Sequence, residues 1–212
     1  MAQPAPPHER FASLPKFSFD IHDSLREWSV SVQQWLTTNK MKLEERQINL
    51  DKLATGCIVF NPEGKVLLIQ RASHDSLPNR WEIPGGAVEN DDSTILYGAA
   101  REMWEESGLV AKRFVRLVTE GPGGRDLQVF PNSTKTLWLC RFSFDIEVQS
   151  TSHVKLDPAE HQDFVWASED EIRVQKIGDR DISITNNAMR SVILESFRLR
   201  NEEQLDAYKG RP

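Results

Sequence analysis

Apolar residues recur in regular blocks from Leu53 onward, whereas residues 1–50 are more polar. Short apolar blocks between turn-forming residues predict strands, and apolar positions spaced three or four residues apart predict helices. The predicted strands cover 53–60, 65–71, 114–118, 136–144 and 164–167. The predicted helices cover 94–107, a short segment after Ser168, and 185–202. Mixed strands with few helices indicate an α/β fold, a sandwich with a mixed β-sheet.

Local signals mark the ends of several of these elements. Residues 61–64 (Asn-Pro-Glu-Gly) are typical of a turn, so 65–71 is predicted to be the returning strand. Asp91, Asp92 or Ser93 can cap the helix at 94–107, and Gly108 occupies the position of a left-handed C-terminal stop. The last helix carries an apolar stripe of Met189, Val192, Ile193 and Phe197.

The polar N-terminal part, residues 1–50, is predicted to be an extension that is partly disordered. Four prolines precede Lys16, and Ser24-x-x-Glu27 fits a capping box at a helix start. The extension also carries aromatic side chains, namely Phe17, Phe19, Trp28 and Trp35. It is either laid on the domain or used for self-association. The compact domain is expected over 51–205, with a tail at 206–212.

Composition narrows the class of protein. The chain has 212 residues and a formal net charge of −6, which is enough for one domain and disfavours a long nucleic acid as a partner. Cys57 and Cys140 lie in apolar, strand-like runs, so we expect buried free thiols in a reducing compartment. The start lacks a secretory profile, and the longest uncharged stretch, 28–39, is too short for a membrane span. A cytoplasmic location, with a nuclear one also open, is expected.

The chemistry is expected on the helix at 94–107. Positions i, i+3 and i+4 share a helix face, so Glu102, Glu105 and Glu106 bring three carboxylates together. A solvated acidic face, with Arg101 pairing Glu105, is the simpler interpretation of such a run taken alone. Three crowded like charges are costly, however, and a hard divalent ion with oxygen ligands offsets the repulsion. Mg²⁺ or Mn²⁺ is the natural choice beside phosphate oxygens.

The surrounding residues favour the metal site. Trp-Glu-Ile-Pro-Gly-Gly-Ala-Val-Glu (81–89) and Arg-Glu-Met-Trp-Glu-Glu-Ser-Gly-Leu (101–109) resemble the two halves of a Nudix box. The resemblance is specific over 81–109 and extends in outline over 53–170. It implies a Nudix-like α/β/α sandwich and a hydrolase that cleaves a phosphate anhydride with Mg²⁺ or Mn²⁺. A small-molecule diphosphate is the expected substrate, and a homodimer is a further expectation from the family.

The resemblance also implies roles for individual residues. Glu102, Glu105 and Glu106 match the metal-binding glutamates, and Arg101 matches the arginine that orients one of them. The backbone of Gly85 and Gly86 is expected to approach the metal. Among the glutamates, Glu105 or Glu106 is expected to accept the proton of the attacking water. Glu160 resembles an additional ligand or base of some family members, and an ordinary loop carboxylate is the alternative.

One part of the box departs from the family pattern of Gly-x5-Glu-x7-Arg. Counted back from Arg101, the glutamate position holds Ser93 and the glycine position holds Ala87. Counted forward from Gly86, the glutamate position holds Asp92 and one residue is left over. The loop is therefore either substituted or one residue longer, with Asp92 or Glu89 replacing the missing carboxylate. The departure bears on loop geometry and rate more than on metal binding.

The substrate is less well defined by the sequence. Arg71 is a candidate for binding a phosphate, with a surface salt bridge as the alternative. Phe130 and Trp138 can stack on a base or line an apolar slot, and Lys135 borders the same excursion at 121–135. A nucleoside-diphosphate-linked compound is the default substrate. Two alternatives stay open: a Nudix-fold sensor that binds a nucleotide without cleaving it, and an enzyme acting on an isoprenoid-type diphosphate, with the aromatic extension covering the substrate.

Overall fold

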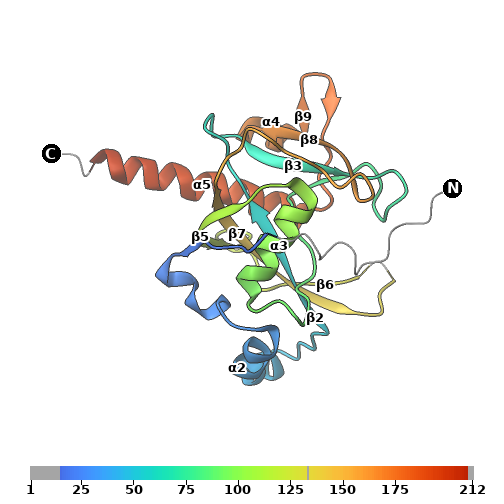
Figure 1. The fold of residues 1–212 in the computed structure, drawn as a ribbon, viewed down its shortest axis with the longest axis vertical. Helices are drawn as coiled ribbons and strands as arrows, with labels where there is room; N and C mark the ends of the chain where they lie inside the picture. Colours follow the sequence, from blue (N-terminus) through green and yellow to red (C-terminus); the bar gives the residue numbers. More distant parts are fainter. Residues whose placement is uncertain (1–14, 133, 210–212) are drawn as a thin grey trace.

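The structure is a computed structural model that describes residues 15–132 and 134–209 (Figure 1). The disordered arm expected before Lys16 falls almost entirely outside these residues. The strands are β1 (Asp20–Ile21), β2 (Lys52–Ile58), β3 (Val66–Arg71), β4 (Trp81–Glu82), β5 (Ala111–Val118), β6 (Gln128–Pro131), β7 (Trp138–Val148), β8 (His161–Ala167), β9 (Lys176–Ile177) and β10 (Arg180–Asp181). The helices are η2 (Asp23–Trp28, 3-10), α2 (Val32–Glu45), α3 (Ile95–Ser107), α4 (Glu169–Val174) and α5 (Asn187–Lys209).

The strands form two principal sheets. The larger has the order β1-β5-β7-β2, with β6 also paired to β7, and the smaller has the order β4-β3-β8. The pairs β2–β7 and β1–β5 are parallel, whereas β5–β7, β6–β7, β3–β4 and β3–β8 are antiparallel. The predicted α/β class with a mixed sheet is therefore confirmed.

The predicted returning strand at 65–71 is present, but it lies beside 53–60 only at the end next to the turn. The turn at 61–64 forms, but β2 continues in the larger sheet while β3 enters the smaller one. Only a bridge between Phe60 and Val66 and a hydrogen bond from Leu67 N to Val59 O join the two strands. The turn residues set the chain reversal, but the partners available on β7 and β8 decide which sheet each strand joins.

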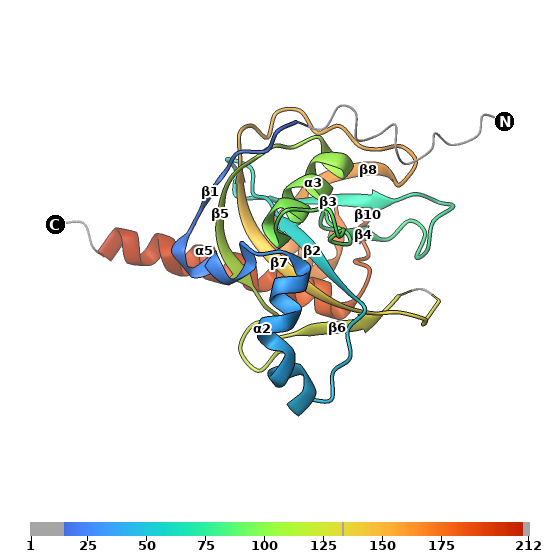
Figure 2. The ribbon, with the colours of Figure 1, turned by 60° about the horizontal axis from the view of Figure 1, so that its bottom comes forward.

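Helices cover both sides of the strands, which makes the fold an α/β/α sandwich. Successive strand residues point to opposite faces, so Cys57 and Leu67 belong to the core cluster that contains α3, while Ile58 and Leu68 belong to the cluster that contains α5. Figures 1 and 2 show α3 in front of the strands and α5 behind them. The stripe predicted on the last helix faces the second cluster.

The extension is laid on the domain. Phe19 packs on Phe114 with 4.8 Å between ring centroids, and Trp35 packs edge-on to Phe142 at 5.0 Å. β1 pairs with β5, and the carbonyl of Val30 accepts a hydrogen bond from Ile95 N at the start of α3. The extension thus supports the helix that carries the glutamates, and α2 is seen below it in Figure 2.

Two element ends differ from the sequence prediction. His22, rather than the box Ser24–Glu27, caps the first helical turn, which is a 3-10 helix; the capping box in this region is formed by Ser31 and Gln34 at the start of α2. The predicted tail at 206–212 begins too early, because α5 continues through Lys209; residues 210–212 lie outside the described part.

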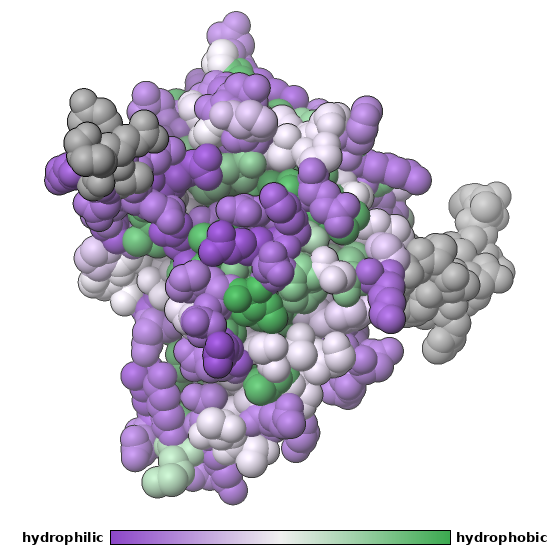
Figure 3. Space-filling model, turned by 60° about the vertical axis from the view of Figure 1, so that its left-hand side comes forward, coloured by the Kyte–Doolittle hydropathy of each residue, from purple (hydrophilic) through white to green (hydrophobic). Residues whose placement is uncertain are grey.

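The large apolar side chains that are exposed on the described surface are scattered. They are Met41, Leu77, Trp138, Phe164, Val174 and Leu205, which come from different elements. Figure 3 shows one face, on which polar residues predominate and the apolar ones form small, separated areas. Within residues 15–132 and 134–209, no helix combines the length and hydropathy needed to cross a membrane. Cys57 and Cys140 are buried free thiols, as expected.

Candidate metal and hydrolase site

The helix α3 positions the acidic cluster. Its N-cap is Thr94, whose hydroxyl accepts a hydrogen bond from Tyr97 N at 3.0 Å, so the prediction that a residue at 91–93 caps the helix is wrong. Gly108 ends the helix with a left-handed φ of 69°, as predicted. Leu96, Ala99, Ala100 and Met103 are fully buried on the core side of the helix. This packing turns the glutamate side toward the loop that follows β4.

The three helix glutamates have different surroundings. Glu106 is buried and accepts a hydrogen bond of 2.6 Å from the backbone N–H of Gly85. Glu102 and Glu105 both bind Nη1 of Arg101, at 2.8 and 2.9 Å. Arg101 is itself buried, so it holds these two carboxylates in place with little freedom to move.

Two glycines, Gly85 and Gly86, allow the backbone of the loop after β4 to lie close to β2 and to the glutamates of α3. Gly85 has φ +146°, and a side chain there would meet the carbonyl oxygen of Thr55 at 2.3 Å. At Gly86 a Cβ atom would lie 2.4 Å from Oε2 of Glu102. The loop is also tied to β2, because Thr55 N donates to the carbonyl of Gly86 at 2.8 Å and Cys57 N donates to that of Pro84 at 2.7 Å. Loop, strand and helix therefore form one rigid frame.

The irregular part of the box is completed by Asp92. Its two carboxylate oxygens accept hydrogen bonds from Nε and Nη2 of Arg101 at 2.9 and 2.8 Å, and one also accepts from Glu89 N at 2.8 Å. The sequence offered Asp92 or Glu89 as the replacement carboxylate. Asp92 is the one that binds Arg101, whereas the Glu89 carboxylate lies 3.8 Å from Nζ of Lys52. Gly98 leaves room for the Asp92 carboxylate, since a Cβ atom at position 98 would lie 2.8 Å from Asp92 Oδ2.

The pKa values of all three helix glutamates are raised. Burial raises the pKa of Glu102 to about 7, although Arg101 opposes the change. Burial and the carboxylate of Glu102 raise the pKa of Glu106 well above its ordinary value. Burial also raises the pKa of Glu105. A bound cation would favour the charged form of all three groups.

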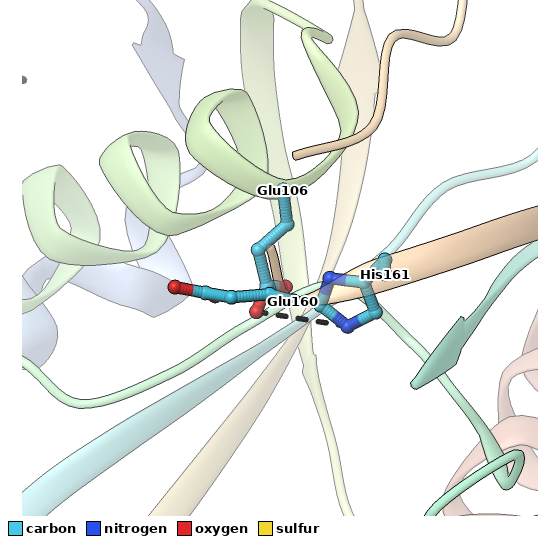
Figure 4. A group of neighbouring side chains, drawn as sticks. All are labelled: Glu106, Glu160 and His161. Atoms are coloured by element: carbon cyan, nitrogen blue, oxygen red, sulfur yellow. Dashed lines mark ion pairs between the residues drawn. The ribbon is translucent and has the colours of Figure 1, made fainter. Parts of the chain in front are cut away.

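A second element brings more donors to the same place. Glu160 precedes β8 and His161 begins it, and both side chains meet Glu106 beneath the last turn of α3 (Figure 4). One ligand atom from each of the three lies within 4.8 Å of the others. The structure therefore brings the sequence-predicted Glu160 to the helix glutamates. His161 was not predicted, because the residues that face it lie far away in the sequence.

A cavity of about 510 Å³ adjoins this cluster through Glu82. Glu82 lines the cavity, and its Oε1 lies 3.5 Å from Nε2 of His161. Arg71 lines the same cavity, with Nη1 bonded to Glu82 at 2.5 Å and Nη2 bonded to Asp75 at 2.5 Å. Arg71 is therefore ion-paired at the cavity wall, and its role in binding a phosphate stays a prediction.

The excursion at 121–135 contributes only part of its predicted residues to the cavity. Phe130 lines it, with the guanidinium of Arg141 stacked 5.0 Å from the ring centroid. Lys135 lies on an exposed turn and Trp138 is 48% exposed, and neither is among the lining residues. Arg141 could not be found from the sequence, because a charged residue within a predicted strand is usually solvated.

Two buried nitrogen donors at the cavity wall have no hydrogen-bond partner among the described residues. Nε of Arg141 and Nε2 of Gln128 are both shielded from solvent, and neither is hydrogen-bonded to any residue that the structure describes. Nor is Arg141 in an ion pair within that part of the chain, and burial lowers the pKa of its guanidinium. Buried donors of this kind are normally satisfied, so an acceptor group of a ligand is the expected partner.

Fold and site together define an α/β domain with an acidic cluster suited to a divalent cation and a polar cavity beside it. The NUDIX domain family matches residues 50–187, and the chain belongs to this family. The resemblance to the Nudix family found in the sequence is thereby confirmed.

Individual relatives agree with this assignment. A MutT-like protein of Streptomyces ambofaciens is 38% identical over 60 residues, which cover 28% of this chain and 36% of the relative. The phosphatase NudJ of Escherichia coli K12 is 29% identical over 122 residues, which cover 57% of this chain and 70% of NudJ. The crystal structure of a MutT protein from Methanosarcina mazei Go1 has a similar fold, with a TM-score of 0.54 at 24% identity, covering 73% of this chain and 99% of that one.

Proposed function

We propose that the protein is a divalent-metal-dependent hydrolase that cleaves a phosphate anhydride in a nucleoside-diphosphate-linked or related organic diphosphate. The observation that carries the proposal is the convergence of Glu102, Glu105 and Glu106 on the loop of Gly85 and Gly86. Three carboxylates with raised pKa values are held there by Arg101 and the loop backbone rather than released to solvent.

The residues present fit Mg²⁺ or Mn²⁺. Both ions take carboxylate and carbonyl oxygens, and either would neutralise the negative charge of the three carboxylates. Glu102, Glu105 and Glu106 would hold the metal, with the backbone at Gly85 and Gly86 beside it and Glu160 completing the set. When bound, the cation would neutralise anhydride oxygens and make a water more acidic.

The chain's own groups then have distinct tasks. Arg101 keeps Glu102 and Glu105 pointed at the reacting centre, and Asp92 keeps Arg101 in place. Glu105 or Glu106 would accept the proton of the attacking water, with Glu160 as a third candidate. The Glu105 side chain is the more exposed of the two, at 26% against 9% for Glu106, so it has the easier access to a water.

The cavities beside the cluster support an organic diphosphate as the substrate. Glu82 joins the cluster to the cavity of about 510 Å³, where Arg71 and Phe130 would bind the substrate. Glu105 lines a second cavity of about 550 Å³ together with Trp104. A diphosphate at the glutamates would thus have room for an organic group. The polar lining of the first cavity, with Arg141 and Gln128, favours a nucleotide-like group over an isoprenoid chain.

The proposal is tested by product release from a panel of anhydrides. Nucleoside triphosphates, dinucleoside polyphosphates, nucleotide sugars and an isoprenoid diphosphate are incubated with and without Mg²⁺ or Mn²⁺. We expect metal-dependent cleavage of at least one nucleotide-type compound. We expect Glu106→Gln to abolish it while circular dichroism shows an intact fold.

The matched control is Glu63→Gln, which changes the same functional group on an exposed turn away from the site. It is expected to retain the parent rate. Equal rates for Glu106→Gln and the parent on every accepted compound would contradict the proposal. Tight binding of a nucleotide without metal-dependent cleavage would instead identify a sensor.

A further inference from the structure

His161 is an unusual buried histidine. Its side chain is 3% exposed, and neither ring nitrogen has a hydrogen-bond partner among the residues that the structure describes. A buried imidazole ordinarily forms a hydrogen bond through at least one nitrogen, because leaving a buried polar group unsatisfied is unfavourable. A ligand outside the protein would satisfy the ring, and its surroundings indicate which one.

The ring faces carboxylates rather than an apolar wall. Figure 4 shows the His161 ring turned toward Glu106, with Nε2 4.0 Å from Oε1 of Glu106. Glu82 lies 3.5 Å from the same nitrogen, but Glu82 already binds Arg71 at 2.5 Å. A ring nitrogen of His161 therefore lies close enough to Glu106 and Glu160 to bind the same ion as these two carboxylates.

The spacing of the three residues suits a shared ion. Ligand atoms of Glu106, Glu160 and His161 all lie within 4.8 Å of one another. Ligands at about 2.2 Å from an ion can lie up to about 4.4 Å apart across it. Small side-chain movements would thus bring all three into contact with one cation.

We propose that His161 supplies a nitrogen ligand to the divalent cation held by Glu106 and Glu160, which biases the site toward Mn²⁺ and against Mg²⁺. The inference rests on the proposed function, since it concerns the same cation. Mg²⁺ strongly prefers oxygen ligands and strict octahedral geometry, whereas imidazole suits the transition metals. A neutral nitrogen donor adds no charge to the carboxylate site, so its main effect is on which metal the site prefers.

The test uses the full chain loaded with Mn²⁺ alone. Electron spin-echo envelope modulation of bound Mn²⁺ detects nitrogen nuclei directly coordinated to the metal. We expect ¹⁴N modulation in the parent and its replacement by ¹⁵N signals in protein grown with ¹⁵N-labelled histidine. The labelling needs no mutation, so it decides the presence of a histidine ligand even if a variant does not fold.

Two variants then assign the ligand to one position. His161→Gln and His161→Asn are expected to lose the ¹⁴N modulation and to raise the Mn²⁺ dissociation constant about 10-fold or more. The Mg²⁺ dissociation constant, measured by competition, should change less. The matched control is His153→Gln, at an exposed position, which should keep both the signal and the affinity.

The outcomes separate this inference from the proposed function. Mn²⁺ that binds in a Glu106-dependent way but shows no histidine nitrogen coupling would overturn the role of His161 and leave the hydrolase proposal standing. Coupling that persists in a folded His161 variant would overturn that role equally. Failure of the parent to bind Mn²⁺ at all would overturn both.

Discussion

The contact between Asp92 and Arg101 gives the sharpest prediction for the unusual part of the motif. The two side chains are 3% and 5% exposed, and two hydrogen bonds of 2.9 and 2.8 Å join them. Asp92→Asn keeps the shape but removes the negative charge and turns one acceptor into a donor that faces the guanidinium. Glu89 N also loses a charged acceptor.

The expected cost can be worked from these contacts. Removing one partner of a buried ion pair typically costs about 3–5 kcal/mol. Arg101 keeps Glu102 and Glu105 as partners, which places Asp92→Asn near the lower end, at about 3 kcal/mol. In a domain of this size that corresponds to a fall in Tm of roughly 6–12 °C.

The assay is reversible unfolding in urea, with Tm from calorimetry as a second measurement. Asp91→Asn is the matched control, because Asp91 is the exposed neighbour and should change the unfolding free energy by less than about 0.5 kcal/mol. A cost for Asp92→Asn below about 0.5 kcal/mol, no larger than that of the control, would refute the view that Asp92 stabilises the box through Arg101.

Other parts of the structure support three more predictions. Burial raises the pKa of Glu102 to about 7, so the protonated group contributes stability that is fully present below pH 4.5 and is lost as the pH rises through 7. The unfolding free energy of metal-free protein should therefore fall by about 3 kcal/mol between pH 5 and 8, with a matching fall in Tm. In a calorimetric pH series, added Mn²⁺ should suppress this fall. Arg141→Leu should raise KM for the best substrate about 10-fold or more with a smaller effect on kcat, whereas Lys135→Ala should change KM less than twofold; equal effects in steady-state kinetics would contradict the role given to the cavity. Trp35→Ala should lower the unfolding free energy in urea by about 3–5 kcal/mol, because the side chain is buried. Met41→Ala, at an exposed position of the same helix, should lower it by less than about 0.5 kcal/mol. Similar values for the two variants would mean that the extension does not stabilise the domain.

The sequence predicted the parts of the fold that depend on local pattern. Helical spacing placed Glu102, Glu105 and Glu106 on one face, and Gly108 marked the helix end because the left-handed conformation there favours glycine. The start of the helix was misplaced, because Asp92 could cap it as well as Thr94. Asp92 is instead used by Arg101, a choice that depends on tertiary contacts and not on capping preference.

Features that join distant segments could not be predicted in the same way. Residues 61–64 formed the predicted turn, yet the strands on either side entered different sheets. His161 and Glu82 meet Glu106 only after three separate elements have packed together. A lone histidine at the start of a strand carries no sequence signal of its own, since most such residues are core or surface positions. His161 could be recognised as a candidate metal ligand only from the carboxylates that surround it in the folded protein.

The expected homodimer and the cytoplasmic or nuclear location stay predictions. The extension, for which self-association was one of two interpretations, uses Phe17, Phe19, Trp28 and Trp35 to pack on the domain core. Sedimentation of the parent protein would decide the oligomeric state independently of its activity.

The central claim is that the carboxylates of α3 hold a divalent cation which contacts a diphosphate. Anomalous diffraction from crystals grown with Mn²⁺ and a non-hydrolysable diphosphate analogue tests it most directly. We expect at least one manganese peak between Glu102, Glu105 and Glu106, with a phosphate oxygen of the analogue bound to the same ion. Bound analogue with no manganese at that turn of the helix would contradict the account.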